Sequence, residues 1–347
     1  MTRETHGSDD AHAQTDRRFG RRTVLRGAAL GAAAPFLAST TASASASATA
    51  SASETAGRKG GGRATGSASF RWLGTSGWRI DVDGRTVLFD PYLTRFKTGL
   101  FDGAFDPATK LTVNPETVRE HIGSPELVLV SHSHWDHIAD VPYIAKSTGA
   151  RVVGTETTYH LLIALGVDPL QISVVKGGEV LDFGGLTVEV VASLHSRNKK
   201  YSYFIPGTRN APPATPPQTI SDLPEGDTLA FQVSVGSDGP TAFLMGASDF
   251  SEQAVRGLRP DLAMVAVPSS ASTHRYVPRL LRALSEPDVV VPVHWDNFEE
   301  PLSGPPLRDP SMDLDVFIAR VHRESPATRI VVPDYRTVYD GDMRPRK

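Results

Sequence analysis

The chain contains no cysteine among its 347 residues, and this absence excludes several kinds of site at once. Disulfides, thiolate zinc sites, cysteine-ligated iron–sulfur clusters and cysteine nucleophiles all need the missing side chain. The formal net charge is only −3, so composition gives no reason to expect a nucleic-acid partner. Apolar runs are too short to predict a transmembrane span. The chain has 11 histidines, and a metal site would have to use histidine and carboxylate.

The N-terminal part of the chain is predicted to lie outside the folded domain. Arg21 and Arg22 precede a mildly apolar run over residues 27–38, and a stretch rich in alanine and serine follows. This order is typical of a secretory signal, and the paired arginines resemble a twin-arginine export signal. We predict a signal peptide with an Ala/Ser-rich segment over 1–56, a flexible linker over 57–66, and export through the twin-arginine translocase. A disordered basic tail or an inner-membrane anchor is the alternative.

Residues 67–347 have the patterns of one folded α/β domain of roughly 280 residues. Short strands joined by turns such as Asp83-Gly84 come first, and strands alternate with helices further along. This mixture predicts two sheets covered by helices. The proline-rich segment 206–227 is expected to be a loop or a lid. Among the expected elements are strands Leu127–Val130, Leu186–Val191, Thr241–Met245 and Val289–Val293, and helices Val141–Ser147, Thr155–Leu165, Val277–Ala283 and Leu314–Arg323.

One short segment concentrates side chains that bind metals. Apolar Leu127–Val130 predicts a buried strand, and His132, His134, Asp136 and His137 follow it. Because side chains alternate along an extended chain, His132 and His134 point to the same side. Asp136 and His137 lie beyond the strand end and can turn toward a second point. The segment can therefore serve two adjacent metal ions.

Three further candidates each follow a predicted strand end: His195, Asp249 and His294. Strand ends at one edge of a sheet can converge although they are far apart in sequence. Imidazoles with carboxylate and water form a ligand set suited to zinc, with manganese or iron as alternatives. Each residue alone is typical of an ordinary loop, but the combined order predicts a metal centre.

The order of these seven residues resembles the binuclear ligand pattern of the metallo-β-lactamase superfamily. Asp90-Pro91 is also similar to a feature of its branch of ascorbate-phosphate lactonase-like and phospholipase D-like hydrolases. The resemblance implies a four-layer αβ/βα sandwich with two mixed sheets and the site at one edge. It also implies two divalent metal ions: one held by His132, His134 and His195, the other by Asp136, His137 and His294, and Asp249 bridging them.

One motif departs from this pattern. The family's fourth motif often reads Gly-Asp, whereas this chain has Gly246-Ala247-Ser248-Asp249. Asp249 is the only acid close to that strand end, and it therefore takes the bridging role in this interpretation. Asp90 is expected to be a hydrogen-bond partner of a metal ligand, with a plain turn residue as the alternative.

The resemblance implies a zinc-dependent hydrolase, and the signal predicted over residues 1–56 would make it an exported one. Hydroxide held between the ions would attack an ester, a lactone or a phosphodiester, and Asp249 and Asp136 are the expected catalytic carboxylates. The expected substrate is a small or lipid-like molecule. Its candidate contacts are Arg197, Lys199, Tyr201 and His274, for which solvated or capping positions are the alternative.

Other functions stay open at this point. A β-lactamase or another amide hydrolase is one, although the missing cysteine excludes the lactamases that use a cysteine ligand. A catalytically silent metal-binding protein is another. A redox protein with two irons would need an electron-transfer partner domain, and the sequence shows none. The oligomeric state is not indicated.

Overall fold

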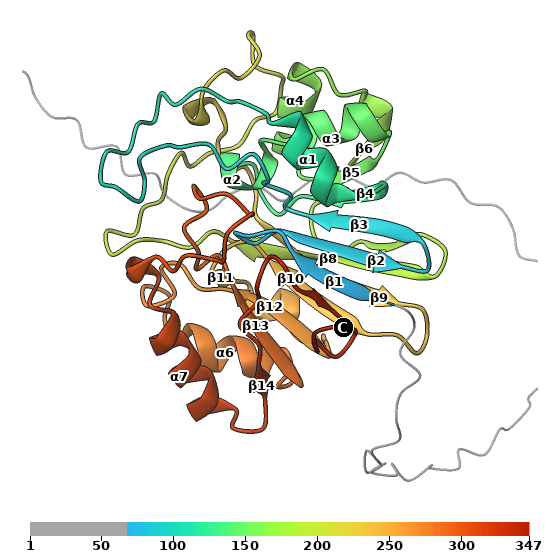
Figure 1. Ribbon diagram of the computed structural model, residues 1–347, viewed down its shortest axis with the longest axis vertical. Helices are drawn as coiled ribbons and strands as arrows, with labels where there is room; N and C mark the ends of the chain where they lie inside the picture. The colour runs from blue at the N-terminus through green and yellow to red at the C-terminus, as the bar shows by residue number, and fades with distance from the viewer. Residues whose placement is uncertain (1–67, 347) are drawn as a thin grey trace, which may run out of the picture. The chain divides into compact units, whose positions relative to one another are not determined.

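Two mixed β-sheets form the centre of the protein in the computed structural model, which describes residues 68–346. Figure 1 shows the sheets between two sets of helices, α1, α3 and α4 on one side and α6 and α7 on the other. This arrangement confirms the predicted α/β sandwich with two mixed sheets. The predicted signal and linker, 1–56 and 57–66, lie outside the described residues.

The first sheet combines an antiparallel half with a parallel half. Strands β1, β2, β3 and β15 pair antiparallel, and β3, β4, β5 and β6 pair parallel. Asp83 and Gly84 both have positive φ between β2 and β3, as a tight hairpin turn requires. The order is β15 (Val338–Tyr339), β1 (Ser69–Trp72), β2 (Trp78–Val82), β3 (Arg85–Phe89), β4 (Pro125–Leu129), β5 (Arg151–Gly154) and β6 (Ile172–Val174).

The second sheet has the same mixed character. Strands β8, β9 and β10 pair antiparallel, and β10, β12, β13 and β14 pair parallel. Its order is β11 (Asp249–Phe250), β8 (Leu186–Leu194), β9 (Leu229–Val235), β10 (Thr241–Met245), β12 (Leu262–Ala266), β13 (Val289–Val293) and β14 (Arg329–Ile330), and β7 (Val180–Asp182) pairs with β8.

Helices α1 and α4 begin where the sequence supplies a capping side chain. The Asn114 side chain accepts a hydrogen bond from the Thr117 N–H at 3.2 Å at the start of α1, and Thr155 does the same for Thr158 at the start of α4. The helices are α1 (Pro115–Ile122), α2 (Trp135–Ile138), α3 (Val141–Thr148), α4 (Glu156–Ala164), α5 (Glu252–Val255), α6 (Tyr276–Ala283) and α7 (Leu314–Glu324). Short 3₁₀ turns cover Pro169–Gln171, Ile220–Asp222 and Pro310–Met312.

The hydrophobic core lies between the sheets and beneath the helices. Phe89 on β3 meets Phe231 on β9 edge to face, with ring centroids 6.1 Å apart, and both rings are fully buried. Every residue of β12 and β13 is buried, which is typical of parallel strands covered on both faces. Among residues 68–346, no helix is long and apolar enough to cross a membrane.

Two elements differ from what the sequence predicted. Residues 135–138, for which the sequence predicted no helix or strand, form the single-turn helix α2. The C-terminal strand β15 pairs with β1 and was not expected, because a two-residue strand leaves no periodic pattern.

Candidate metal centre

The segment after β4 presents four side chains of types that can bind metals to one pocket. His134 is the N-cap of α2, and its carbonyl accepts the backbone N–H of His137 at 3.0 Å. This single helical turn brings Asp136 and His137 back toward the histidines that precede it. All four residues, including His132, are at most 5% exposed. Local helix formation therefore gathers donors that an extended chain would spread apart.

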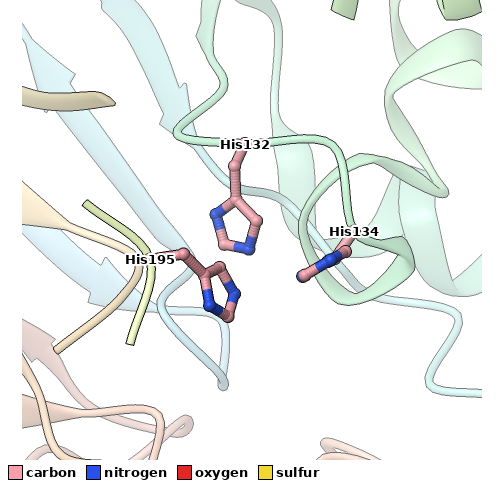
Figure 2. A group of neighbouring side chains, drawn as sticks. All are labelled: His132, His134 and His195. Atoms are coloured by element: carbon pink, nitrogen blue, oxygen red, sulfur yellow. The ribbon is translucent and has the colours of Figure 1, made fainter. Parts of the chain in front are cut away.

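His132, His134 and His195 form a first donor group, whose ligand atoms lie within 4.8 Å of one another. Figure 2 shows the three rings pointing toward a common point. The centroids of the three imidazole rings are 4.8–4.9 Å apart, and the rings pack edge to face. His195 comes directly after β8, so the second sheet completes a group that the first sheet begins.

The first group is electronically suited to bind a cation. Burial, with smaller contributions from neighbouring histidines, lowers the pKa of His195 to about 3. Burial likewise lowers the pKa of His134 to about 4 and that of His132 well below its usual value. The three imidazoles are therefore neutral at pH 7. The Nε2 atoms of His132 and His134 are buried without a hydrogen-bond partner in the protein, which fits nitrogens that serve as metal ligands.

Asp136, His137 and His294 form the second donor group. The Asp136 Oδ2 atom lies 3.1 Å from His294 Nε2 and 3.4 Å from His137 Nε2. His294 follows β13 with a left-handed φ of 61°, and its backbone N–H donates to the Thr75 carbonyl at 2.7 Å. The two groups adjoin, because the ring centroids of His132 and His137 are 3.9 Å apart.

Asp90 fixes the orientation of His137. Its Oδ2 atom accepts the His137 Nδ1–H at 2.8 Å, which leaves Nε2 facing Asp136. The Ser131 hydroxyl and the Ser76 hydroxyl donate to the same oxygen at 2.6 and 2.9 Å. Burial lowers the pKa of His137, but Asp136 and Asp90 outweigh it and raise that pKa to about 10. Asp90 is therefore a hydrogen-bond partner of a candidate metal ligand, rather than a plain turn residue.

Gly246 allows this contact to form. A Cβ atom at this position would lie 2.3 Å from Ser131 Oγ and 2.7 Å from Asp90 Oδ2. We expect Gly246→Ala to displace the Asp90 carboxylate and to weaken metal binding by about 10–100-fold, the usual loss when the partner of a ligand is disturbed. Competition with a fluorescent chelator measures this. Gly304→Ala is the control, because a Cβ there meets nothing within 4 Å. Equal metal affinity in both variants would contradict the role of Gly246.

Asp249 does not join the donor groups. It begins β11, its carboxylate accepts the Phe250 N–H at 2.8 Å, and it lines a separate surface pocket beside Arg279. After β10 the chain instead places Gly246 and Ala247 at the pocket that holds the six donors. The predicted bridging role of Asp249 is therefore corrected: the turn between β10 and β11 carries it away from the histidines.

The predicted substrate contacts also lie outside the metal pocket. Tyr201 is 75% exposed and Lys199 is exposed. Arg197 lies over the ring of Tyr203 at 5.0 Å, and His274 lines the pocket of Asp249. Most other residues that surround the metal pocket come from loops without periodic patterns and were not predicted as substrate contacts: Leu100, Phe105, Tyr203, Phe204 and Phe298. Trp135 on α2 and Met312 on a 3₁₀ turn also line it.

The pocket itself is a cavity of about 280 Å³ with largely apolar walls. Phe105, Trp135 and Phe204 pack against one another, with centroids 5.2–6.1 Å apart. Tyr203 stacks on the ring of His195 at 4.6 Å. The donors thus lie at the base of a pocket suited to an apolar group.

A family model described as the beta-lactamase superfamily domain matches residues 69–294, well over half of the chain. The chain belongs to the beta-lactamase superfamily. Among similar curated members, a UPF0173 metal-dependent hydrolase from Methylocella silvestris is 28% identical over 65% of this chain and 84% of its own length. Another from Methanopyrus kandleri is 27% identical over 71% of this chain and 94% of its own.

Solved structures share the superfamily fold. Igni18, a metallo hydrolase from Ignicoccus hospitalis, has a TM-score of 0.50 and 20% identity over 79% of this chain and 99% of its own. A possible metal-dependent hydrolase from Veillonella parvula has a TM-score of 0.51 and 16% identity, again over 79% and 99%. At these identities the likeness concerns the fold.

Proposed function

We propose that this member of the superfamily is a binuclear, zinc-dependent hydrolase of an ester, a lactone or a phosphodiester. The observation that carries the proposal is the pair of three-donor groups, one of three histidines and one with Asp136, that line a single pocket. Their residues fit divalent cations, because the first group holds two buried nitrogens without partners and the second combines imidazole with carboxylate. Two such ions, when bound, activate water and polarise a carbonyl or phosphoryl group.

The protein's own residues supply binding and exclusion of water. The apolar wall of Phe105, Trp135 and Phe204 would hold the non-reacting part of the substrate over the donors. Asp90 keeps His137 in one orientation, and the Ser196 carbonyl does so for His195 by accepting its Nδ1–H at 2.8 Å. Both histidines thereby direct Nε2 toward the pocket. The relatives named as metal-dependent hydrolases support this assignment.

Metal content and hydrolysis test the proposal together. We expect purified protein to carry about two ions per chain, to hydrolyse members of a panel of nitrophenyl esters, lactones and bis-nitrophenyl phosphate, and to lose activity on chelation. Zinc should restore the activity. Turnover of nitrocefin alone would favour a β-lactamase instead, and metal-loaded protein that is inactive on every substrate would favour a silent metal-binding protein. Export through the twin-arginine translocase stays a prediction from residues 1–56.

A further inference from the structure

The two donor groups share no protein oxygen. Among residues 68–346, the two donor groups contain a single carboxylate, that of Asp136. The same carboxylate is also the only one among the described residues that lines the pocket. Asp90 lies behind the pocket, and its two oxygens accept hydrogen bonds from Ser76, Ser131 and His137. Asp249 faces a different pocket. Apart from Asp136, no Asp or Glu stands among the described residues that line the pocket.

Ala247 lines the pocket where such a carboxylate could stand. The preceding Gly246 packs against the second group, since a Cβ on it would lie 3.1 Å from His137 Cε1. Ala247 is the next residue, is 4% exposed and borders the same cavity as all six donors. Its methyl group neither coordinates a cation nor fills the space that a longer side chain would take.

The charges near the pocket are unbalanced when it is loaded with metal. Two divalent ions would bring four positive charges, whereas Asp136 is the one carboxylate among the described residues that line the pocket. The surrounding walls are apolar, and excess charge in such surroundings is costly unless a counter-ion accompanies it. The excess positive charge would therefore stabilise an anion that binds in the cavity.

We infer that Ala247 leaves open a subsite for an oxyanion of the ligand, which spans the two donor groups in place of a protein carboxylate. The ligand class is a phosphate-type or carboxylate group that carries an apolar substituent, since Phe105, Trp135 and Phe204 border the same cavity. This inference rests on the proposed two-metal function and narrows its substrate class to anions.

Calorimetric titration of zinc-loaded protein with phenylphosphonate, benzoate and inorganic phosphate tests the subsite. Wild-type protein should bind phenylphosphonate or benzoate, and more tightly than inorganic phosphate, because of the apolar wall. The relative affinities of phenylphosphonate and benzoate identify the preferred oxyanion. Ala247→Asp supplies the missing carboxylate. It should hold zinc more tightly by about tenfold or more and bind the anions more weakly by a similar factor.

Two variants control for size and for charge. Ala247→Asn has the size of aspartate without its charge, so it should not tighten zinc binding. Ala271→Asp makes the same charge change at an exposed position and should leave both affinities unchanged. If Ala247→Asp does not fold, the test compares anion binding by the wild type with anion binding by Ala247→Asn. The asparagine variant should bind the anions more weakly, because its larger side chain obstructs the subsite.

The outcomes separate this inference from the proposed function. Protein that holds two zinc ions but binds none of the three anions would overturn the subsite alone. The subsite would also be overturned if Ala247→Asp bound the anions as tightly as the wild type and held zinc no more tightly. Protein that retains no metal would overturn the proposed function and, with it, the subsite.

Discussion

Replacing His134 with alanine should reduce hydrolysis by about 10³-fold. A metal ion contributes several kcal/mol to the transition state, and each 1.36 kcal/mol corresponds to a factor of ten in rate. His134 is one of only three donors in its group, and its neutral imidazole is 4% exposed. The measurement is kcat/KM on whichever panel substrate is hydrolysed, together with the metal content of the purified variant.

His322→Ala is the matched control, because His322 is exposed on α7. It should retain wild-type activity and metal content. If the His134 variant hydrolysed the substrate as fast as the wild type, the metal-dependent mechanism would be wrong. Loss of activity with loss of about one ion per chain would assign His134 to one of two separate ions.

The second large effect concerns a buried ion pair that positions His294. Arg95 Nη2 lies 2.8 Å from Asp296 Oδ2, and both side chains are at most 1% exposed. The other carboxylate oxygen, Oδ1, accepts the Thr75 N–H at 3.0 Å, and the Thr75 carbonyl accepts the His294 N–H. Tyr335 also donates to Asp296 at 2.5 Å. Asp296 therefore anchors the turn that presents a candidate ligand.

Arg95→Met should destabilise the protein by about 3–5 kcal/mol, because it leaves the Asp296 charge buried without its cation. The melting temperature should fall by roughly 5–15 °C. Urea denaturation of the metal-free protein measures the change in free energy directly. Arg308→Met is the matched control. The ion pair of Arg308 with Asp315 is largely exposed, so it should contribute at most about 1 kcal/mol to the free energy of unfolding. A loss below about 1 kcal/mol in the Arg95 variant would contradict a stabilising role for the pair.

The sequence predicted the fold and the six converging donors because both leave local patterns. Apolar runs mark the strands, and the donors follow strand ends whose topology brings them to one edge. Asp249 was misplaced for a physical reason: the conformation of the turn after β10 decides which of residues 246–249 faces the pocket, and no periodicity reports a turn. The six ligand assignments themselves stay predictions until metal is measured.

Interactions between distant loops were beyond prediction. Arg95, Asp296 and Tyr335 lie far apart in sequence, and none stands in a motif. Phe105 comes from the long segment before α1, and Phe204 from the loop after His195. Only tertiary packing brings such residues together, so a single sequence carries no local signal of their contact.

Each donor group takes side chains from both sheets. His132 and His134 follow β4 of the first sheet and His195 follows β8 of the second, while Asp136 and His137 are joined by His294 after β13. An ion in either group would therefore cross-link the two halves of the sandwich. Because such an ion would bind only where both halves are folded together, we expect the rate of unfolding to fall as metal occupancy rises.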